Sequence, residues 1–154
     1  MITIGKKFEF AAAHRLGRHE GKCRNPHGHN YVLEIDLTGP NQMEGSGQHM
    51  ILDYYIVKQI IEREIMQRFD HKDLNVEILK FWPDSAPEED NITTAENLVA
   101  LFAQILGPAF YDAAPHAILS RLRLQETPGS WVEWRPEANN SGVFGAPIIG
   151  QVNY

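Results

Sequence analysis

Three histidines near the start of the chain have the residue type and spacing of a metal site. His27 and His29 flank Gly28, so on a β-strand both imidazoles point to one face, and the glycine would leave room for a bulky ligand between them. His14 ends an earlier alternating segment and has the parity to join them if the two strands pair. Three imidazoles leave the fourth position of a tetrahedral zinc ion open, as in catalytic sites. The alternative is three unrelated surface or core histidines.

The single cysteine, Cys23, lies four residues before His27 in a loop that is expected to pass beside this site. A nearby cation would lower the pKa of its thiol, and the thiolate could then act as a base. An internal disulfide is excluded because the sequence has no second cysteine. The alternative is an inert, buried thiol.

A carboxylate and an imidazole are adjacent at Asp70-His71, where the first predicted helix ends. An imidazole that is oriented by a carboxylate is a usual proton-transfer relay. The alternative is a helix cap followed by a solvated side chain.

Glu126 shares its strand parity with Ile118, Leu122 and Leu124, which predicts that it faces the covered side of its strand. An ionised carboxylate there needs a charged or bidentate hydrogen-bonding partner, which a guanidine-like ring edge would provide. The alternative is that the strand ends at Leu124 and that Glu126 is solvated in the turn.

Hydrophobic periodicity predicts the elements that carry these residues, in the order β-β-α-α-β-β. Alternation predicts strands at residues 3–14, 27–37, 117–126 and 131–135. Three- and four-residue spacings predict a helix at 53–69, with Asp53 as its N-cap, and a second helix that begins at the capping box of residues 93–96 and stops at Gly107-Pro108. Residues 76–92 are expected to form an irregular acidic loop. This order predicts an α+β fold, an antiparallel sheet with helices on one face.

Composition limits the classes of partner. The 154 residues suit one domain, at 1–135, followed by a tail at 136–154 that is rich in Asn, Gly and Pro. A net charge of −6 argues against nucleic acid as a binding partner.

No apolar stretch is long enough for a membrane span, and the start has no basic-then-apolar leader, so we expect a cytoplasmic protein. A local basic pocket could still hold a small anion, and its candidates lie in one loop: Arg15, Arg18, Lys22 and Arg24.

Five short segments, taken in order and spacing, resemble one enzyme family. They are residues 8–16 (FEFAAAHRL), 23–31 (CRNPHGHNY), 69–75 (FDHKDLN), 94–98 (TAENL) and 125–127 (QET). Over roughly residues 3 to 135 the sequence resembles the 6-pyruvoyltetrahydropterin synthase and 6-carboxytetrahydropterin synthase family. The resemblance implies the tunnelling fold, in which sheets from several subunits join into a barrel, with active sites between subunits and commonly a hexamer of two trimers.

The resemblance also implies roles for particular residues and a reaction. His14, His27 and His29 would bind zinc, Cys23 would transfer protons with Asp70 and His71 as relay partners, and Glu126 would anchor the amino-pyrimidine edge of a pterin. Thr94 falls at a family threonine near the pterin, although helix capping gives Thr94 or Thr93 a structural role as well.

The implied substrate is dihydroneopterin triphosphate. The three-residue gap between Cys23 and His27 resembles the queuosine-pathway branch, which forms 6-carboxytetrahydropterin, acetaldehyde and triphosphate. The alternatives are a 6-pyruvoyltetrahydropterin synthase and a zinc-bearing barrel that only binds a pterin or a protein partner.

Overall fold

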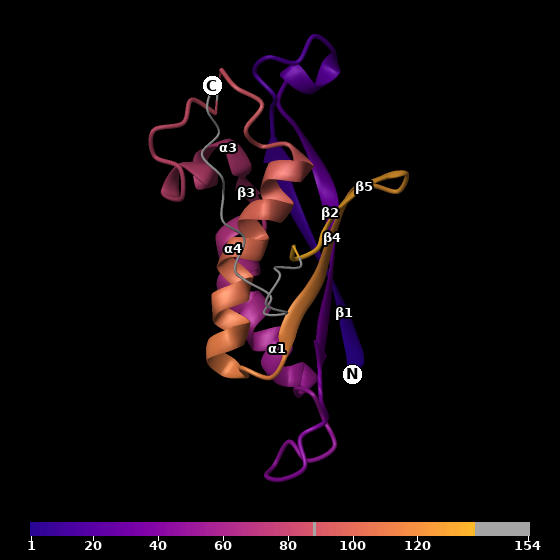
Figure 1. The fold of residues 1–154 in the computed structure, drawn as a ribbon. Helices are drawn as coiled ribbons and strands as arrows, with labels where there is room; N and C mark the ends of the chain where they lie inside the picture. The colour runs from indigo at the N-terminus through magenta and orange to yellow at the C-terminus, as the bar shows by residue number, and fades with distance from the viewer. Residues whose placement is uncertain (88, 138–154) are drawn as a thin grey trace.

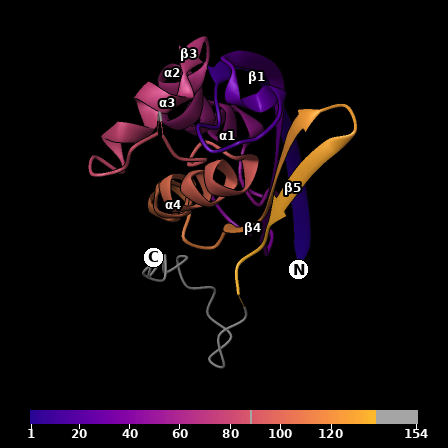
Figure 2. The same ribbon diagram turned by 90° about the horizontal axis from the view of Figure 1, so that it is seen from above.

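The computed structural model describes residues 1–87 and 89–137, which form one sheet with helices packed against one face. The strand order is β3-β1-β2-β4-β5. The strands are β1 (Ile2–His14), β2 (His27–Gly39), β3 (Lys72–Asp73), β4 (Ile118–Thr127) and β5 (Ser130–Trp134). The helices are α1 (Tyr54–Ile61), α2 (Gln67–Phe69), α3 (Leu74–Glu77) and α4 (Ala95–Ala113). Figures 1 and 2 show these helices on a single side of the sheet, which confirms the predicted α+β layers.

The two long strands β1 and β2 pair antiparallel along their whole length, from Ile2 opposite Gly39 to His14 opposite His27. The loop that joins them lies at one end of the sheet, and the loop after β2 lies at the opposite end (Figure 1). Phe10 and Tyr31 are opposite each other and buried. Because side chains alternate, His14, His27 and His29 share the helix-covered face with this aromatic pair.

Strand β4 carries a bulge that the sequence pattern does not predict. Its register with β2 shifts between Asp36 and Leu37, so Leu119 and Leu122 are both buried although they are three residues apart. The prediction that Ile118 shares the covered face is therefore wrong, since Ile118 is only partly buried. Beyond the bulge the predicted alternation holds through Leu124 to Glu126.

Three further predictions about elements need correction. The predicted helix 53–69 consists of α1 and α2 joined by a π-helical segment, Glu62–Met66. The predicted loop 76–92 begins with the end of α3 and a 3-10 turn, Ile78–Lys80. The two-residue strand β3, parallel to β1, is absent from the predicted order. A strand this short has no readable alternation.

Helix α4 does not stop at Gly107-Pro108 but continues to Ala113 with Pro108 inside it. Pro108 is exposed, whereas Leu106 and Phe110 on either side are fully buried. Burial of these two side chains keeps the chain helical across a residue that lacks a backbone N–H. At the other end, Thr94 caps the helix by accepting from the N–H of Asn97, so the cap lies one residue later than in the predicted box.

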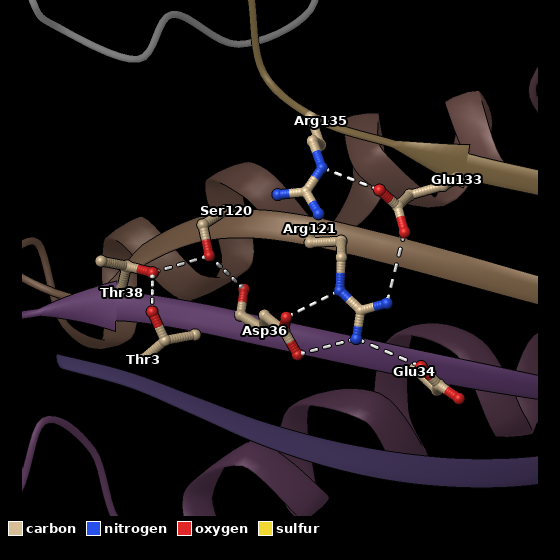
Figure 3. Close-up of polar contacts among 8 residues, drawn as sticks. All are labelled: Thr3, Glu34, Asp36, Thr38, Ser120, Arg121, Glu133 and Arg135. Atoms are coloured by element: carbon tan, nitrogen blue, oxygen red, sulfur yellow. Dashed lines mark hydrogen bonds and ion pairs between the residues drawn. The ribbon is translucent and has the colours of Figure 1, made fainter.

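The uncovered face of the sheet carries a charged network centred on Arg121 (Figure 3). Arg121 on β4 donates to Asp36 and Glu34 on β2, at 2.7 and 3.1 Å, and lies 3.4 Å from Glu133 on β5. These contacts raise the pKa of Arg121, mainly through the hydrogen bond with Asp36. The guanidinium therefore joins three strands at the position of the bulge.

Candidate functional site

The structure brings His14, His27 and His29 together at the end of the β1–β2 pair. Ring centroids are 4.6 Å apart for His14 and His27, 5.2 Å for His14 and His29, and 5.0 Å for His27 and His29. One nitrogen from each ring lies within 4.8 Å of the other two. His14 is buried and the other two are half-buried, so the group could hold a metal ion that a ligand can still reach.

Two of these rings are oriented through Nδ1 by backbone carbonyls. His14 Nδ1 lies 3.0 Å from the carbonyl oxygen of Thr93, and His27 Nδ1 lies 2.8 Å from that of Asn25. Such contacts fix the ring and leave Nε2 to a metal. His14 Nε2 is buried and has no hydrogen-bond partner in the described part of the chain. A buried orphan nitrogen that faces two more imidazoles is what a metal ligand requires.

The pKa shifts of His14 and His29 also fit a metal site. Burial lowers the pKa of His14, and the other two imidazoles lower it further. The Thr93 carbonyl and the Glu126 carboxylate act in the opposite direction and raise it. Burial likewise lowers the pKa of His29, against the opposing charge of Glu126. Neutral imidazole is the form that binds a metal ion. Three imidazole nitrogen donors suit zinc.

Glu126 lies directly beside the histidines. Strand β4 extends to Thr127, so the alternative in which Glu126 follows the strand in a turn is excluded. Its Oε1 is 3.4 Å from His14 Nε2 and 3.6 Å from His29 Nε2. The site therefore combines three nitrogen donors with one carboxylate that remains partly exposed.

Asp70 and His71 form a pair at the edge of β1. Asp70 Oδ1 is 2.8 Å from His71 Nδ1 and also accepts from the N–H of Ala11 at 2.9 Å. His71 donates its own N–H to the Ala11 carbonyl at 2.6 Å and has a positive φ of 57°. Its side chain is 80% exposed. The imidazole is thus oriented by a carboxylate, as the predicted relay requires, but it points to solvent.

An open pocket of about 530 Å³ adjoins this pair, and its lining runs from His71 across β1 to His29 on β2. Four of its lining residues have small or polar side chains and lie on the uncovered face of the sheet. They are Ala11, Ala13, Gly28 and Asn30. A Cβ at Gly28 would lie 3.0 Å from the carbonyl oxygen of Ala12. The expectation that Gly28 makes room between the imidazoles is therefore wrong, because its missing side chain opens this face and allows β1 to approach.

Cys23 lies in a 3-10 turn, Lys22–Arg24, and is half-buried. Its carbonyl accepts from the N–H of Leu16 at 2.9 Å. Within residues 1–87 and 89–137, no hydrogen bond or ion pair joins its thiol to the imidazoles or to the Asp70–His71 pair. Within one chain, Cys23 therefore stands apart from the Asp70–His71 pair in its described hydrogen bonds and ion pairs.

Sequence reasoning does not predict how two buried polar residues support the site. Asn75, 1% exposed, accepts from the N–H of Arg15 at 2.9 Å and donates to the carbonyls of Arg15 and Pro87 at 3.0 and 2.7 Å. Thr93, fully buried, donates its hydroxyl to the Arg15 carbonyl at 3.1 Å. Together they fix the chain next to His14. The signal in the sequence is Asn75 itself, at the end of the segment FDHKDLN.

Comparisons with known proteins agree with this geometry. The family model described as 6-pyruvoyl tetrahydropterin synthase matches residues 3–137. The chain belongs to the 6-pyruvoyl tetrahydropterin synthase family. Membership confirms the resemblance drawn from the five segments and the predicted class of enzyme.

Relatives of both product types occur among the curated proteins. The 6-carboxy-5,6,7,8-tetrahydropterin synthase of Haemophilus influenzae is 29% identical, over 88% of this chain and 99% of that protein. The enzyme of that name from Rickettsia felis is 30% identical, over 86% and 99%. The 6-pyruvoyl tetrahydrobiopterin synthase of Dictyostelium discoideum is also 30% identical, over 88% and 97%.

Solved structures confirm the tunnelling fold. The 6-pyruvoyl tetrahydropterin synthase of Caenorhabditis elegans superposes with a TM-score of 0.66 at 24% identity, over 88% of this chain and 96% of that one. Among the described residues, no helix has the length and apolar character needed to cross a membrane.

Proposed function

We propose that the chain is a zinc-dependent lyase that converts 7,8-dihydroneopterin triphosphate and water to 6-carboxy-5,6,7,8-tetrahydropterin, acetaldehyde and triphosphate. The observation that carries this proposal is the cluster of three imidazoles beside Glu126 in a chain of the pterin synthase family. The identity and coverage of the carboxytetrahydropterin synthases from two bacteria support this product.

His14, His27 and His29 would hold zinc, which, when bound, would acidify hydroxyl groups of the substrate side chain. Glu126 would accept hydrogen bonds from the amino-pyrimidine edge of the pterin, since an ionised carboxylate pairs well with two parallel donors. Thr94 would lie near the ring, although its hydroxyl accepts from Asn97 in the structure.

Cys23, Asp70 and His71 would move protons. The thiolate of Cys23 would remove a proton from a carbon of the side chain, and His71, oriented by Asp70, would accept or return protons during the rearrangement. Both groups must reach the same side chain, yet His71 lies at the β3 edge of the sheet with its side chain exposed, and no hydrogen bond or ion pair among the described residues joins it to Cys23 or to the histidine cluster.

A second copy of the chain would resolve this separation. Strand β3 pairs with β1 only at Ala12 and Ala13, and β5 is the opposite edge of the described sheet, so both edges offer backbone groups for pairing. We propose that the chain forms a homo-oligomer, a hexamer of two trimers, in which His71 of one copy serves the zinc site of another. The cytoplasmic location stays a prediction.

The second candidate function is a 6-pyruvoyltetrahydropterin synthase, which the 30% identical protein from Dictyostelium discoideum favours. Product analysis separates the two. Zinc-loaded protein is incubated with dihydroneopterin triphosphate, pterins are identified by mass spectrometry and acetaldehyde is assayed, with Cys23→Ala as control. Acetaldehyde with 6-carboxytetrahydropterin, lost in the variant, supports the first function, whereas 6-pyruvoyltetrahydropterin without acetaldehyde supports the second. No turnover by zinc-loaded protein would contradict both and favour a pterin-binding protein.

A further inference from the structure

The loop that carries Cys23, residues 15–26, is bonded to a second loop that is far away in the sequence. Inside this Cys23 loop, the N–H of Leu16 donates to the Cys23 carbonyl at 2.9 Å. The next N–H along the chain, that of Gly17, donates to the carbonyl of Asp90 at 3.1 Å. The backbone that is bonded to Cys23 through one residue is therefore bonded to Asp90 through the next.

The side chain of Asn91 adds a contact that a substitution can remove. Its Oδ1 accepts from the backbone N–H of Arg18 at 2.9 Å. The Arg18 guanidinium also lies 2.9 Å from Oδ1 of Asp90, but this side chain is 74% exposed, and ion pairs at such positions contribute little to stability. The Asn91 oxygen holds the main chain itself, which fixes the course of the loop more directly than a contact at the tip of a long side chain does.

The segment that follows Asn91 also contacts the histidine cluster. Two residues later, the carbonyl of Thr93 orients His14 through Nδ1 at 3.0 Å. The N–H of Thr94 donates to the Asn91 carbonyl at 3.3 Å and closes a turn that contains both contacts. This turn therefore connects the Cys23 loop to one of the three imidazoles.

We propose that Asn91 is a positioning residue for Cys23: its side-chain oxygen holds the Cys23 loop against the turn that orients His14, so that the thiol keeps one position relative to the imidazoles. This inference rests on the proposed role of Cys23 in proton transfer. A base that removes a proton from carbon must lie at a defined distance from it, and a displacement of about 1 Å can lower the rate by about 100-fold. The contact with Asn91 restricts a loop whose residues are largely exposed.

Three variants of the zinc-loaded, full-length protein test the inference. Asn91→Ala removes the acceptor, and Asn91→Asp keeps an oxygen at the same place. Asn41→Ala is the control, because Asn41 is exposed in the loop after β2, at the opposite end of the sheet (Figure 1). With dihydroneopterin triphosphate, Asn91→Ala should lower kcat about tenfold and change KM less than about threefold, because it displaces a proton-transferring group and leaves substrate binding intact. Asn91→Asp should recover most of the loss, and Asn41→Ala should match wild type.

Hydrogen exchange separates positioning from a general loss of stability. A peptide that covers residues 15–25 should exchange about tenfold faster in Asn91→Ala, because the N–H of Arg18 loses its acceptor and the loop opens locally. Zinc affinity, measured by competition with a chromophoric chelator, should stay within about twofold, because the Thr93 carbonyl still orients His14. The melting temperature of the metal-free protein should fall by less than about 4 °C, since one hydrogen bond near the surface is lost.

Each contrary result has a distinct meaning. If Asn91→Ala keeps wild-type turnover while Cys23→Ala loses it, the inference is wrong and the proposed function stands. Lower turnover without faster exchange of residues 15–25, or with a large loss of zinc affinity, also overturns the inference, as does an equal loss in Asn91→Asp. If wild type has no turnover, the proposed function fails, and the inference fails with it.

Discussion

Two of the three clustered histidines are held through the nitrogen that faces away from the site. His14 depends on the carbonyl of Thr93, and Thr93 in turn donates to the carbonyl of Arg15, which Asn75 also contacts. A single buried amide thus supports the backbone beside a metal-binding side chain. Such outer contacts commonly change metal affinity when they are removed.

Replacement of Asn75 by alanine tests this support. The variant leaves the N–H of Arg15 and the carbonyls of Arg15 and Pro87 without their partner, so we expect a loss of about 2–4 kcal/mol in the free energy of unfolding. Zinc affinity should fall about tenfold. Urea unfolding with a chelator present and chelator competition measure the two effects. Asn97→Ala is the control, since its exposed side chain donates to the Ile92 carbonyl and to no other residue within 1–87 and 89–137, and it should change neither quantity by much. Equal effects of the two variants would contradict the proposed role of Asn75 in supporting the backbone beside His14.

Asp70 gives a pH-dependent prediction. Burial tends to raise its pKa, but the N–H of Ala11 and the His71 imidazole outweigh burial and lower it below 3.8. A carboxyl with a lowered pKa stabilises the folded state above its ordinary pKa, and this stabilisation disappears as the pH falls through the lowered value. Wild type should therefore be more stable than Asp70→Asn at pH 7, and the difference should shrink below pH 4. Urea unfolding in chelator measures it, and a constant difference would contradict the prediction.

At the scale of single residues, alternation in the sequence is sufficient to predict that His14, His27, His29 and Glu126 share a face, because strand geometry fixes this parity. It cannot predict Asn75, whose partners lie 60 residues away at Arg15 and 12 residues away at Pro87. Such contacts depend on how loops pack against one another, and the hydrophobic periodicity of the sequence cannot predict them.

At the scale of elements, the bulge in β4 directs both Ser120 and Arg121 to the uncovered face, where each contacts β2. Alternation alone predicts neither the bulge nor this network. Helix α4 shows the same limit, since Pro108 is a usual stop signal that burial of Leu106 and Phe110 overrides. Local signals predict the identity of elements better than their ends.

Arg121→Met tests whether the network stabilises the sheet. The variant keeps the length of the side chain but leaves Asp36 and Glu34 without this cation, and Glu133 with Arg135 alone. We expect a loss of about 2–3 kcal/mol, below the value for a fully buried pair because these groups are partly solvated. Arg135→Met is the matched control, and it should cost less than about 1 kcal/mol because Arg135 is an exposed partner of Glu133. Chemical unfolding measures both, and equal losses would contradict a role of the network.

At the scale of the whole molecule, the Asp70–His71 pair lies at the β3 edge of the sheet, and no hydrogen bond or ion pair among the described residues joins it to the histidine cluster. An active site shared between copies predicts complementation between two inactive variants. Cys23→Ala and His71→Ala should each lose turnover alone, and mixed oligomers should regain it in about a quarter of their sites if the chains mix at random. Turnover after joint refolding measures this. No recovery in oligomers shown to be mixed would contradict a shared site.

Sequence alone cannot predict this separation of the two groups, because the five family segments appear in one chain and suggest one site. The structure separates them through the pairing of β1 with β3, which places His71 beside Ala11 on the outer edge of the sheet.

The most direct measurement is the release of triphosphate from dihydroneopterin triphosphate by metal-stripped protein as zinc is added back. The metal-free protein should be inactive, and turnover should rise in proportion to zinc and level off at about one ion per chain, as three imidazoles with one open position require. His27→Ala should bind zinc more weakly and stay inactive at the same zinc concentration, although it folds. Full turnover by the metal-free protein, or by zinc-free His27→Ala, would contradict a catalytic metal held by these three histidines.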